Sequence, residues 1–354
     1  MAISEQSVCP IFIEHPTSGN LDQIGSGVFV EIQGELFLLT AAHVTDYEQV
    51  GRILIPGVQG LIAPHGSFAH LAVAAGGKRL DDKLDIAYYR LNREILDELP
   101  SRLKPLQRED VALFDSLTEG DIYSFSGYPY RKTRLRGDRI ETEFFSYAGC
   151  AVDDQTYQKL GYDPRMHIVI RFERKHAYSR DGFRITPPLP HGVSGGGVFS
   201  WRKDAFVGGD PEERRLVGIA HTYHTTQNCL VGTRLNAFVS CIYLNNPSLA
   251  PQTESRSIVP VIMGMAWYRQ DEWERLKREF HDADRYPTTW RAWRQKAERG
   301  VDELLARGRI ISPVRLSADE IQEFCTARKL ANISKTRIRL VNEKLYRLAQ
   351  ETYF

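Results

Sequence analysis

The first two thirds of the chain consist of short apolar runs broken by glycine, proline and aspartate. Runs such as SGVFVEI (26–32), LDIAYYRL (84–91) and HIVIRFERK (167–175) are rich in β-branched and aromatic residues, which is typical of strands. They form two groups of about six, separated by segment 92–120. The pattern predicts a mainly β fold of two tandem six-stranded antiparallel β-barrels, the first over about 8–100 and the second over about 118–240.

The pattern changes after residue 246. Residues 247–262 are rich in proline and serine and are expected to form a linker. From Met263 onward the apolar spacing becomes helical, which predicts a small α-helical accessory domain over 263–354. Ser317 and Glu320 match the capping box that begins a helix.

The helical segment offers two further sequence features. Its four tryptophans, at 267, 273, 290 and 293, are expected to form the core of the domain rather than an exposed aromatic surface. The basic stretch 327–347 could touch nucleic acid, but such runs more often form a solvated helix face. Nucleic acid is therefore not an expected partner.

Composition places the chain among ordinary globular proteins. Its 354 residues are 42% hydrophobic and 26% charged, with a net charge of +1, so bulk electrostatics indicates no partner. No apolar run is long enough for a membrane span or fits a secretory signal. The five cysteines are scattered and odd in number, so we expect buried, inert thiols, no disulfide framework, and a reducing cytoplasm. No spacing suggests a metal site, and no cofactor is expected.

The segment LPHGVSGGGVFS places four glycines between Gly192 and Gly197 around a single serine, Ser194. This density indicates a backbone that closely approaches another group. A serine hydroxyl becomes a nucleophile when a base removes its proton and N–H groups stabilise the resulting oxyanion. The chain offers His43 at the end of the run LLTAAHV and Asp85 at the start of DIAYYRL.

Together, TAAH, DIA and GVSGG resemble the motifs of the trypsin/chymotrypsin-like serine peptidases, in that family's order of histidine, aspartate and serine. The resemblance covers residues 8 to about 245 and implies that His43 is the general base and Asp85 orients it. It also implies that Ser194 is the nucleophile, with the N–H groups of Gly192 and Ser194 as the oxyanion hole. The segment also fits the G-x-S-x-G elbow of α/β-hydrolases, but the chain lacks the βαβ alternation which that fold requires.

Two positions depart from the secreted members of the family. Val193 stands where those members carry the aspartate that pairs with a new N-terminus after zymogen cleavage, so activation by N-terminal clipping is not expected. Pro188 stands where trypsin-like members carry the aspartate that selects basic side chains, so a preference for lysine or arginine is unsupported.

The resemblance places the specificity pocket along segment 216–224, giving the expected substrate-binding residues Pro188, Ala220, His221 and Thr222. His221 and His224 could donate hydrogen bonds to a polar or acidic substrate side chain. They could equally be structural, and a small or apolar pocket is also open.

The resemblance implies an intracellular, bacterial-type serine endopeptidase over residues 1–246. The helical domain 263–354 would then regulate the enzyme or recruit a protein partner, and a role in prokaryotic stress or phage defence is a narrower hypothesis by analogy. The alternative is a non-catalytic binding or scaffold protein on a peptidase fold.

Overall fold

A computed structural model describes residues 3–73, 76–113, 122–136, 139–179, 182–201, 214–249, 262–305 and 310–353. The chain divides into two compact units, Met1–Val239 and Ser240–Phe354, and each is described by itself. The expected linker 247–262 lies mostly outside the described residues.

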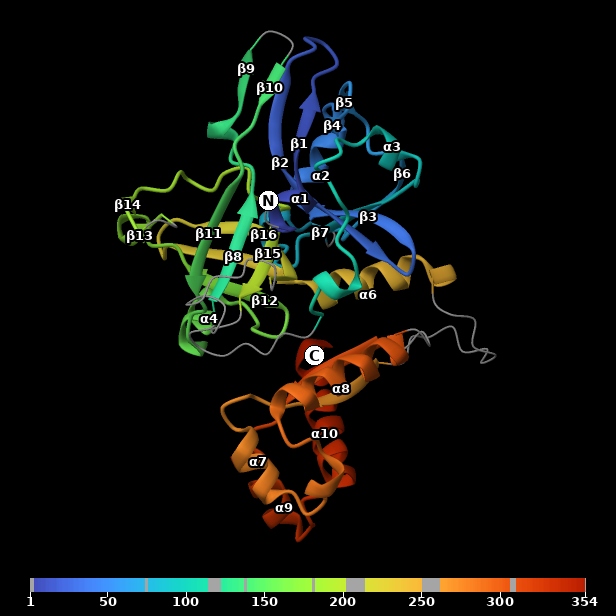
Figure 1. Ribbon diagram of the computed structural model, residues 1–354, viewed down its shortest axis with the longest axis vertical. Coiled ribbons are helices and arrows are strands. Elements are labelled where there is room, and N and C mark those ends of the chain that lie inside the picture. The colour runs from blue at the N-terminus through green and yellow to red at the C-terminus, as the bar shows by residue number, and fades with distance from the viewer. Residues whose placement is uncertain are drawn as a thin grey trace. The chain divides into compact units, whose positions relative to one another are not determined.

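The first sheet is antiparallel, with the strand order β5-β4-β1-β2-β3-β7-β6 (Figure 1, blue to cyan). Cys9, Phe29 and Leu38 are among the fully buried side chains of its core. Short helices α1 (Ile3–Ser7), α2 (Ala42–Thr45) and α3 (Ile95–Glu98) accompany it. The strands are β1 (Val8–Glu14), β2 (Leu21–Ile32), β3 (Glu35–Ala41), β4 (Arg52–Gly57), β5 (Gly60–Ile62), β6 (Gly66–His70) and β7 (Ile86–Leu91).

The second sheet has six antiparallel strands in the order β11-β8-β15-β16-β17-β12 (Figure 1, green to yellow). Helix α4 (Asp154–Leu160) precedes β12, and α6 (Leu235–Asn245) follows β17. Two hairpins, β9 (Arg134–Arg136) with β10 (Arg139–Glu141) and β13 (Ala177–Tyr178) with β14 (Arg184–Ile185), lie outside the sheet. The strands are β8 (Ile122–Gly127), β11 (Phe145–Cys150), β12 (His167–Arg171), β15 (Gly197–Trp201), β16 (Arg215–His224) and β17 (Cys229–Arg234).

This arrangement confirms the expected fold class of two curled antiparallel β units followed by helices, as in a chymotrypsin-like double barrel. All six strands of the second sheet coincide with runs predicted from the sequence. The first sheet has one strand more than expected because β5 spans three residues, too few to show an alternating pattern.

The glycine segment passes through a crowded part of this unit. A Cβ on Gly195 would lie 2.0 Å from the carbonyl oxygen of Ser26, and one on Gly196 would lie 2.1 Å from that of Ser126. Gly195 also has a φ of +84°, in the left-handed region that glycine favours. What approaches these glycines is therefore backbone from β2 and β8.

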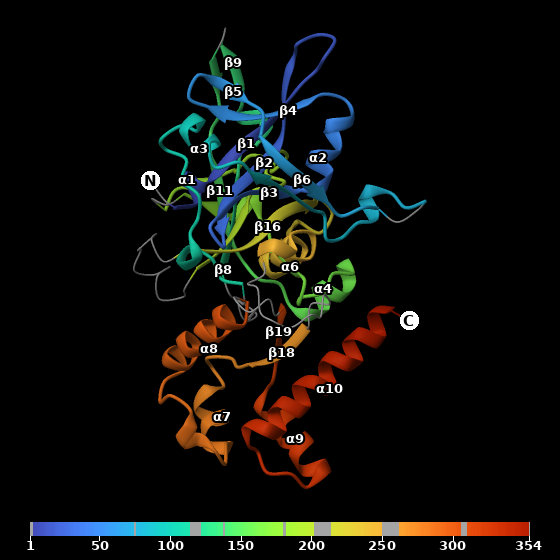
Figure 2. The same ribbon diagram turned by 90° about the vertical axis from the view of Figure 1, so that its right-hand side faces the viewer.

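The second unit departs from the expected all-helical domain. Strands β18 (Ile262–Trp267) and β19 (Ile310–Arg315) form a parallel pair, so the prediction of helix from Met263 onward was wrong at both segments. The segment between the two strands carries helices α7 and α8. Such a crossover is needed because parallel strands cannot be joined by a short turn. Helix α10 packs against β18 (Figure 2). The helices are α7 (Trp273–Glu279), α8 (Trp290–Leu305), α9 (Ala318–Arg328) and α10 (Ser334–Tyr353).

The core of the second unit is aromatic. Trp267, Trp273 and Trp293 are buried, and the rings of Trp273 and Trp293 stack with centroids 5.2 Å apart, which confirms their expected core role. Trp290 is only half-buried. The Ser317 capping box is present at the start of α9.

The basic stretch 327–347 is largely paired within this unit. Arg337 is 1% exposed and its guanidinium lies 2.7 Å from a carboxylate oxygen of Asp282. Glu343 accepts hydrogen bonds from both Arg328 and Arg339. Part of this basic charge is therefore already paired with neighbouring carboxylates.

All five cysteines are free, and Cys9, Cys229 and Cys325 are buried. Cys150 is exposed, so the expectation of a buried thiol was wrong there, at the end of an edge strand. Among the described residues, no cluster of histidine, cysteine and acidic side chains is placed to hold a metal ion. In the same part of the chain, no helix combines the length and apolar character needed to cross a membrane.

We predict that Gly195→Ala lowers the free energy of unfolding by about 3 kcal/mol, because the new Cβ would be strained in φ and would overlap fixed backbone. Gly34→Ala is the matched control, since Gly34 has a φ of +76° but no heavy atom within 4 Å of its Cβ position. This variant should lose only about 1 kcal/mol from the backbone conformation. Urea unfolding measures both, and equal losses would contradict the close-approach explanation.

Candidate active site

The register of the first sheet brings His43 and Asp85 together. Strands β3 and β7 pair so that Ala41 lies opposite Ile86. The residue following β3 therefore lies beside the residue preceding β7, and the N–H of Ala42 donates to the carbonyl of Asp85 at 3.0 Å. His43 is the second residue of α2, directly above this junction.

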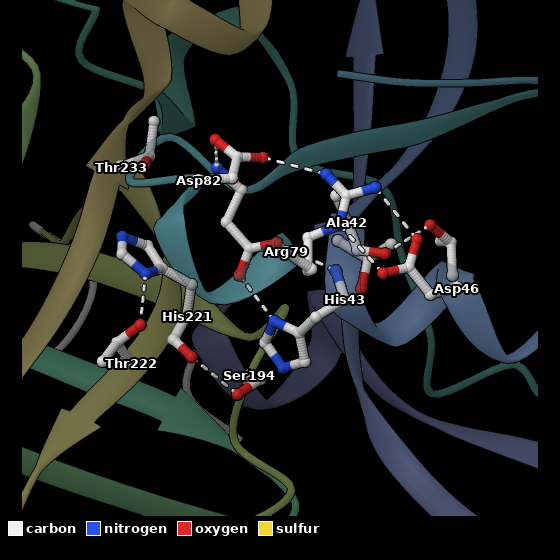
Figure 3. Close-up of polar contacts among 12 residues, drawn as sticks. Ala42, His43, Asp46, Arg79, Asp82, Ser194, His221, Thr222 and Thr233 are labelled. Atoms are coloured by element: carbon white, nitrogen blue, oxygen red, sulfur yellow. Dashed lines mark hydrogen bonds and ion pairs between the residues drawn. The ribbon is translucent and has the colours of Figure 1, made fainter. Parts of the chain in front are cut away.

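Both carboxylate oxygens of Asp85 contact His43. The Nδ1 of His43 lies 2.5 Å from Oδ2, and the backbone N–H of His43 donates to Oδ1 at 2.9 Å. Since a carboxylate only accepts hydrogen bonds, Nδ1 carries a ring proton, and in the neutral ring Nε2 therefore keeps its lone pair. The free edge of the His43 ring points toward Ser194 (Figure 3).

The backbone conformation and the burial of Asp85 both bear on its contact with His43. It is 5% exposed and has a φ of +50°, a left-handed conformation that aspartate tolerates better than most residues. Burial alone would raise the pKa of Asp85, but the hydrogen bond and charge of His43 outweigh it and leave that pKa below its usual value. The carboxylate is thus ionised at neutral pH.

Ser194 lies in the turn that precedes β15, and backbone hydrogen bonds tie this turn to both sheets. The Ser194 carbonyl accepts from the N–H of Ser26 on β2 at 2.7 Å, and the N–H of Gly195 donates to the carbonyl of Ala220 on β16 at 2.7 Å. The turn also lies against the His43 helix, because a Cβ on Gly25 would lie 2.6 Å from Val44 and 3.0 Å from the Ser194 carbonyl oxygen. The three residues predicted as a triad are therefore gathered at the seam between the two sheets.

The hydroxyl of Ser194 does not donate to His43 in this structure. It donates to the carbonyl oxygen of His221 at 2.9 Å (Figure 3). To donate to Nε2 of His43, the hydroxyl would have to give up this acceptor.

The two N–H groups expected to bind an oxyanion are available. The N–H groups of Val193 and Gly195 donate to the carbonyls of Pro190 and Ala220. Among the described residues, no acceptor bonds the N–H of Gly192 or of Ser194. Gly192 has a φ of +97°, which orients the turn in a way that residues with a Cβ rarely adopt.

The expected substrate-binding residues do not all contribute a side chain to an open surface. Ala220 and His221 are buried, whereas Pro188 and Thr222 are half-buried. The pairing of β16 with β17 shifts register between Ala220 and Thr222, and such a bulge redirects a side chain. At this bulge, His221 turns its Nδ1 to the hydroxyl of Thr222 at 2.8 Å.

Two residues that the sequence did not single out join His221 and His224. The ring of His167, from the start of β12, lies 6.3 Å from that of His221. Tyr162 packs on His167 at 4.8 Å and hydrogen-bonds Nε2 of His224 at 3.1 Å. The only signal in the sequence was a polar residue opening the apolar run 167–171, and such residues are common at strand ends.

Burial keeps this histidine group neutral. Desolvation lowers the pKa of His221 to about 3 and also lowers the pKa of His167 and of His224. The Nε2 atom of His221 is buried with no hydrogen-bond partner among the described residues. At neutral pH these rings place no positive charge beside Asp85.

Val193, the residue before Ser194, is 2% exposed and belongs to the hydrophobic core of the second sheet. This position therefore contributes to hydrophobic packing and has no charge that could form an ion pair with an N-terminal ammonium.

Comparison with known proteins gives structural likeness only. No protein-family model matches the sequence, and no curated protein matches it. Solved structures that resemble the chain include mouse neuropsin, a serine protease (TM-score 0.45, 14% identity, 69% of this chain and 96% of that one). Kallikrein-related peptidase 10 (0.42, 16%, 70% and 97%) and a protease from M. tuberculosis in its active form (0.38, 15%, 68% and 80%) are also similar. Since these TM-scores lie below 0.5, the description of the fold rests on this chain's own strands and registers.

The lowered pKa of His221 predicts acid sensitivity. Below its usual pKa of about 6.5 the unfolded chain binds a proton that the folded chain does not, so stability falls with pH until about pH 3. Between pH 6.5 and pH 5, this group should account for a loss of about 2 kcal/mol. In His221→Gln the pH slope of the unfolding free energy should be shallower, whereas exposed His176→Gln should keep the wild-type slope. A His221→Gln slope equal to the wild-type slope would refute the assignment.

Proposed function

We propose that this chain is a serine endopeptidase that hydrolyses peptide bonds through His43, Asp85 and Ser194. The observation that carries the proposal is the contact of both Asp85 oxygens with His43, at 2.5 and 2.9 Å. This contact fixes the tautomer that leaves Nε2 basic, on the ring edge that points toward Ser194 (Figure 3). A histidine held only for stability would not need its free nitrogen directed at a serine hydroxyl.

The proposed mechanism follows from these positions. Ser194 turns its hydroxyl from His221 to Nε2 of His43, and Oγ attacks the substrate carbonyl carbon as Nε2 takes the proton. The N–H groups of Gly192 and Ser194 bind the resulting oxyanion. His43 then gives its proton to the leaving nitrogen as the C–N bond breaks, which leaves an acyl-enzyme. A water molecule repeats the sequence and regenerates the serine.

The substrate in this proposal is a protein or peptide, and no resident cofactor is required. Lysine or arginine beside the scissile bond is not favoured, because Pro188 carries no charge. The five free thiols favour a reducing compartment such as the cytoplasm. Regulation or recruitment by residues 263–354, and a role in prokaryotic stress or phage defence, remain hypotheses.

A second candidate function is a non-catalytic binding protein on the same fold. The observation that favours it is the hydrogen bond from Ser194 to the carbonyl of His221, which directs the hydroxyl proton to a carbonyl instead of to the base. The two candidates differ in whether Ser194 reacts as a nucleophile.

A fluorophosphonate probe tests the nucleophile without knowledge of the natural substrate. We expect the probe to label the wild type on Ser194 and to leave Ser194→Ala unlabelled, because phosphonylation requires the activated hydroxyl. Ser67→Ala, which removes an exposed serine on β6, should be labelled like the wild type. Absence of labelling in all three proteins would favour the binding function, and equal labelling of Ser194→Ala and wild type would reject Ser194.

The labelling rate should also fall as the pH is lowered. A histidine accepts a proton only when its ring is neutral, so the rate should fall in proportion to the fraction of neutral imidazole. Labelling kinetics measured from pH 8 to pH 4 test this dependence, with thermal melts at each pH to exclude unfolding. A rate that stays constant down to pH 4 in folded protein would contradict His43 as the base.

A further inference from the structure

Arg79 is a largely buried arginine beside the candidate active site. It lies in a short 3-10 helix, Arg79–Asp81, within the segment that connects β6 to β7. Its side chain is 16% exposed, and its guanidinium group faces Asp46 and Asp82 (Figure 3) as well as one backbone carbonyl. The mechanism proposed above does not use this arginine.

One side of the guanidinium holds the element that carries His43. Asp46 follows α2 directly, three residues after His43, and its backbone N–H donates to the carbonyl of Ala42. Arg79 donates to Asp46 through Nε at 2.8 Å and through Nη2 at 2.9 Å. This two-point contact restrains both the position and the orientation of the carboxylate.

The other side of the guanidinium holds the turn that carries Asp85. The Nη1 of Arg79 donates to Oδ2 of Asp82 at 2.9 Å and to the carbonyl of Leu71 at 2.8 Å. The second oxygen of Asp82 accepts from the N–H groups of Leu84 and Asp85 at 3.1 and 3.2 Å. Asp82 therefore links the guanidinium to the left-handed residue that presents the carboxylate to His43.

These contacts close a ring. The ring runs from His43 through α2 to Asp46, through Arg79 to Asp82, and back through Asp85 to His43. Its two halves come from separate segments, and Arg79 is the member that contacts an acidic residue on each. The hydrogen bonds to Asp46 and, to a smaller extent, to Asp82 raise the pKa of Arg79. The guanidinium is therefore charged at every pH used in the experiments below.

We propose that Arg79 is a positioning residue for the candidate triad, which holds Asp85 and His43 at their mutual distance by bridging Asp46 and Asp82. This inference rests on the proposed function. It assigns Arg79 no contact with substrate or with the reacting atoms.

The geometry requires arginine rather than a positive charge alone. Four hydrogen bonds leave Nε, Nη1 and Nη2 in three directions within one plane. A lysine ammonium donates from a single point and cannot hold both oxygens of Asp46 while reaching Asp82. Arg79→Lys should therefore keep only part of the labelling rate that Arg79→Met loses.

The fluorophosphonate labelling rate tests the proposal in the full-length chain. We expect Arg79→Met to be labelled about 10- to 100-fold more slowly than the wild type, since small displacements of reacting groups have effects of this size. Arg79→Lys should be intermediate and Asp46→Asn should be slowed in the same direction. The double variant Arg79→Met/Asp46→Asn should be no slower than Arg79→Met alone, because the two residues act through one contact.

A matched control separates positioning from stability. Arg90 on β7 is a half-buried arginine whose Nε lies 3.3 Å from a carboxylate oxygen of Glu35 in the first sheet, so Arg90→Met should lower the melting temperature without slowing labelling. Proton NMR gives a readout that general destabilisation would not change. The strongly deshielded His43 Nδ1 proton should be seen in the wild type and Arg90→Met, and should broaden or disappear in Arg79→Met.

The outcomes are distinguishable. Suppose that the wild type is labelled on Ser194. If Arg79→Met is labelled at a rate within twofold of the wild type, or its rate falls no more than that of Arg90→Met, the positioning role is overturned while the proposed function stands. If the wild type is not labelled, the proposed function is rejected. If Arg79→Met does not fold, the labelling rates of Arg79→Lys and Asp46→Asn test the positioning role instead. Wild-type labelling rates in both variants would overturn the proposal.

Discussion

The contact between Asp85 and His43 is the interaction on which the rest of the candidate site depends. One carboxylate oxygen accepts a hydrogen bond from the ring N–H of His43 and the other accepts one from its backbone N–H. This arrangement requires an ionised carboxylate that is almost fully buried, which is unfavourable unless hydrogen bonds replace the lost water. His43 supplies two of those bonds and holds the pKa of Asp85 down despite its burial.

Several neighbouring features are explained by the need to maintain this contact. The left-handed backbone of Asp85 would be strained in a free chain, but Asp82 fixes the two N–H groups that lead into it. The neighbouring histidines are kept neutral by desolvation, so they do not compete with His43 for the carboxylate. The site thus combines a buried charge with surroundings that favour only one partner for it.

The glycine turn solves a separate geometric problem at the seam between the sheets. Ser194 must come close to His43, in the helix that follows β3 of the first sheet, while lying in the turn that leads into β15 of the second. Backbone bonds to Ser26 on β2 and from Gly195 to Ala220 on β16 hold the turn to both. Gly195 and Gly196 allow this because a side chain at either position would overlap the backbone carbonyls of Ser26 or Ser126.

The sequence by itself predicted most strands of the two large sheets, the helical character of the C-terminal segment and the candidate residues His43, Asp85 and Ser194, because these depend on local patterns and short motifs. It missed β5 and the parallel pair β18–β19, whose segments are short or carry too weak an alternation to distinguish strand from helix. The Arg79 bridge, the buried state of His221 and its contacts with His167 and Tyr162 were decided only by the tertiary structure. Each of these joins residues from distant segments, and the burial and charge they experience arise only when the sheets pack together.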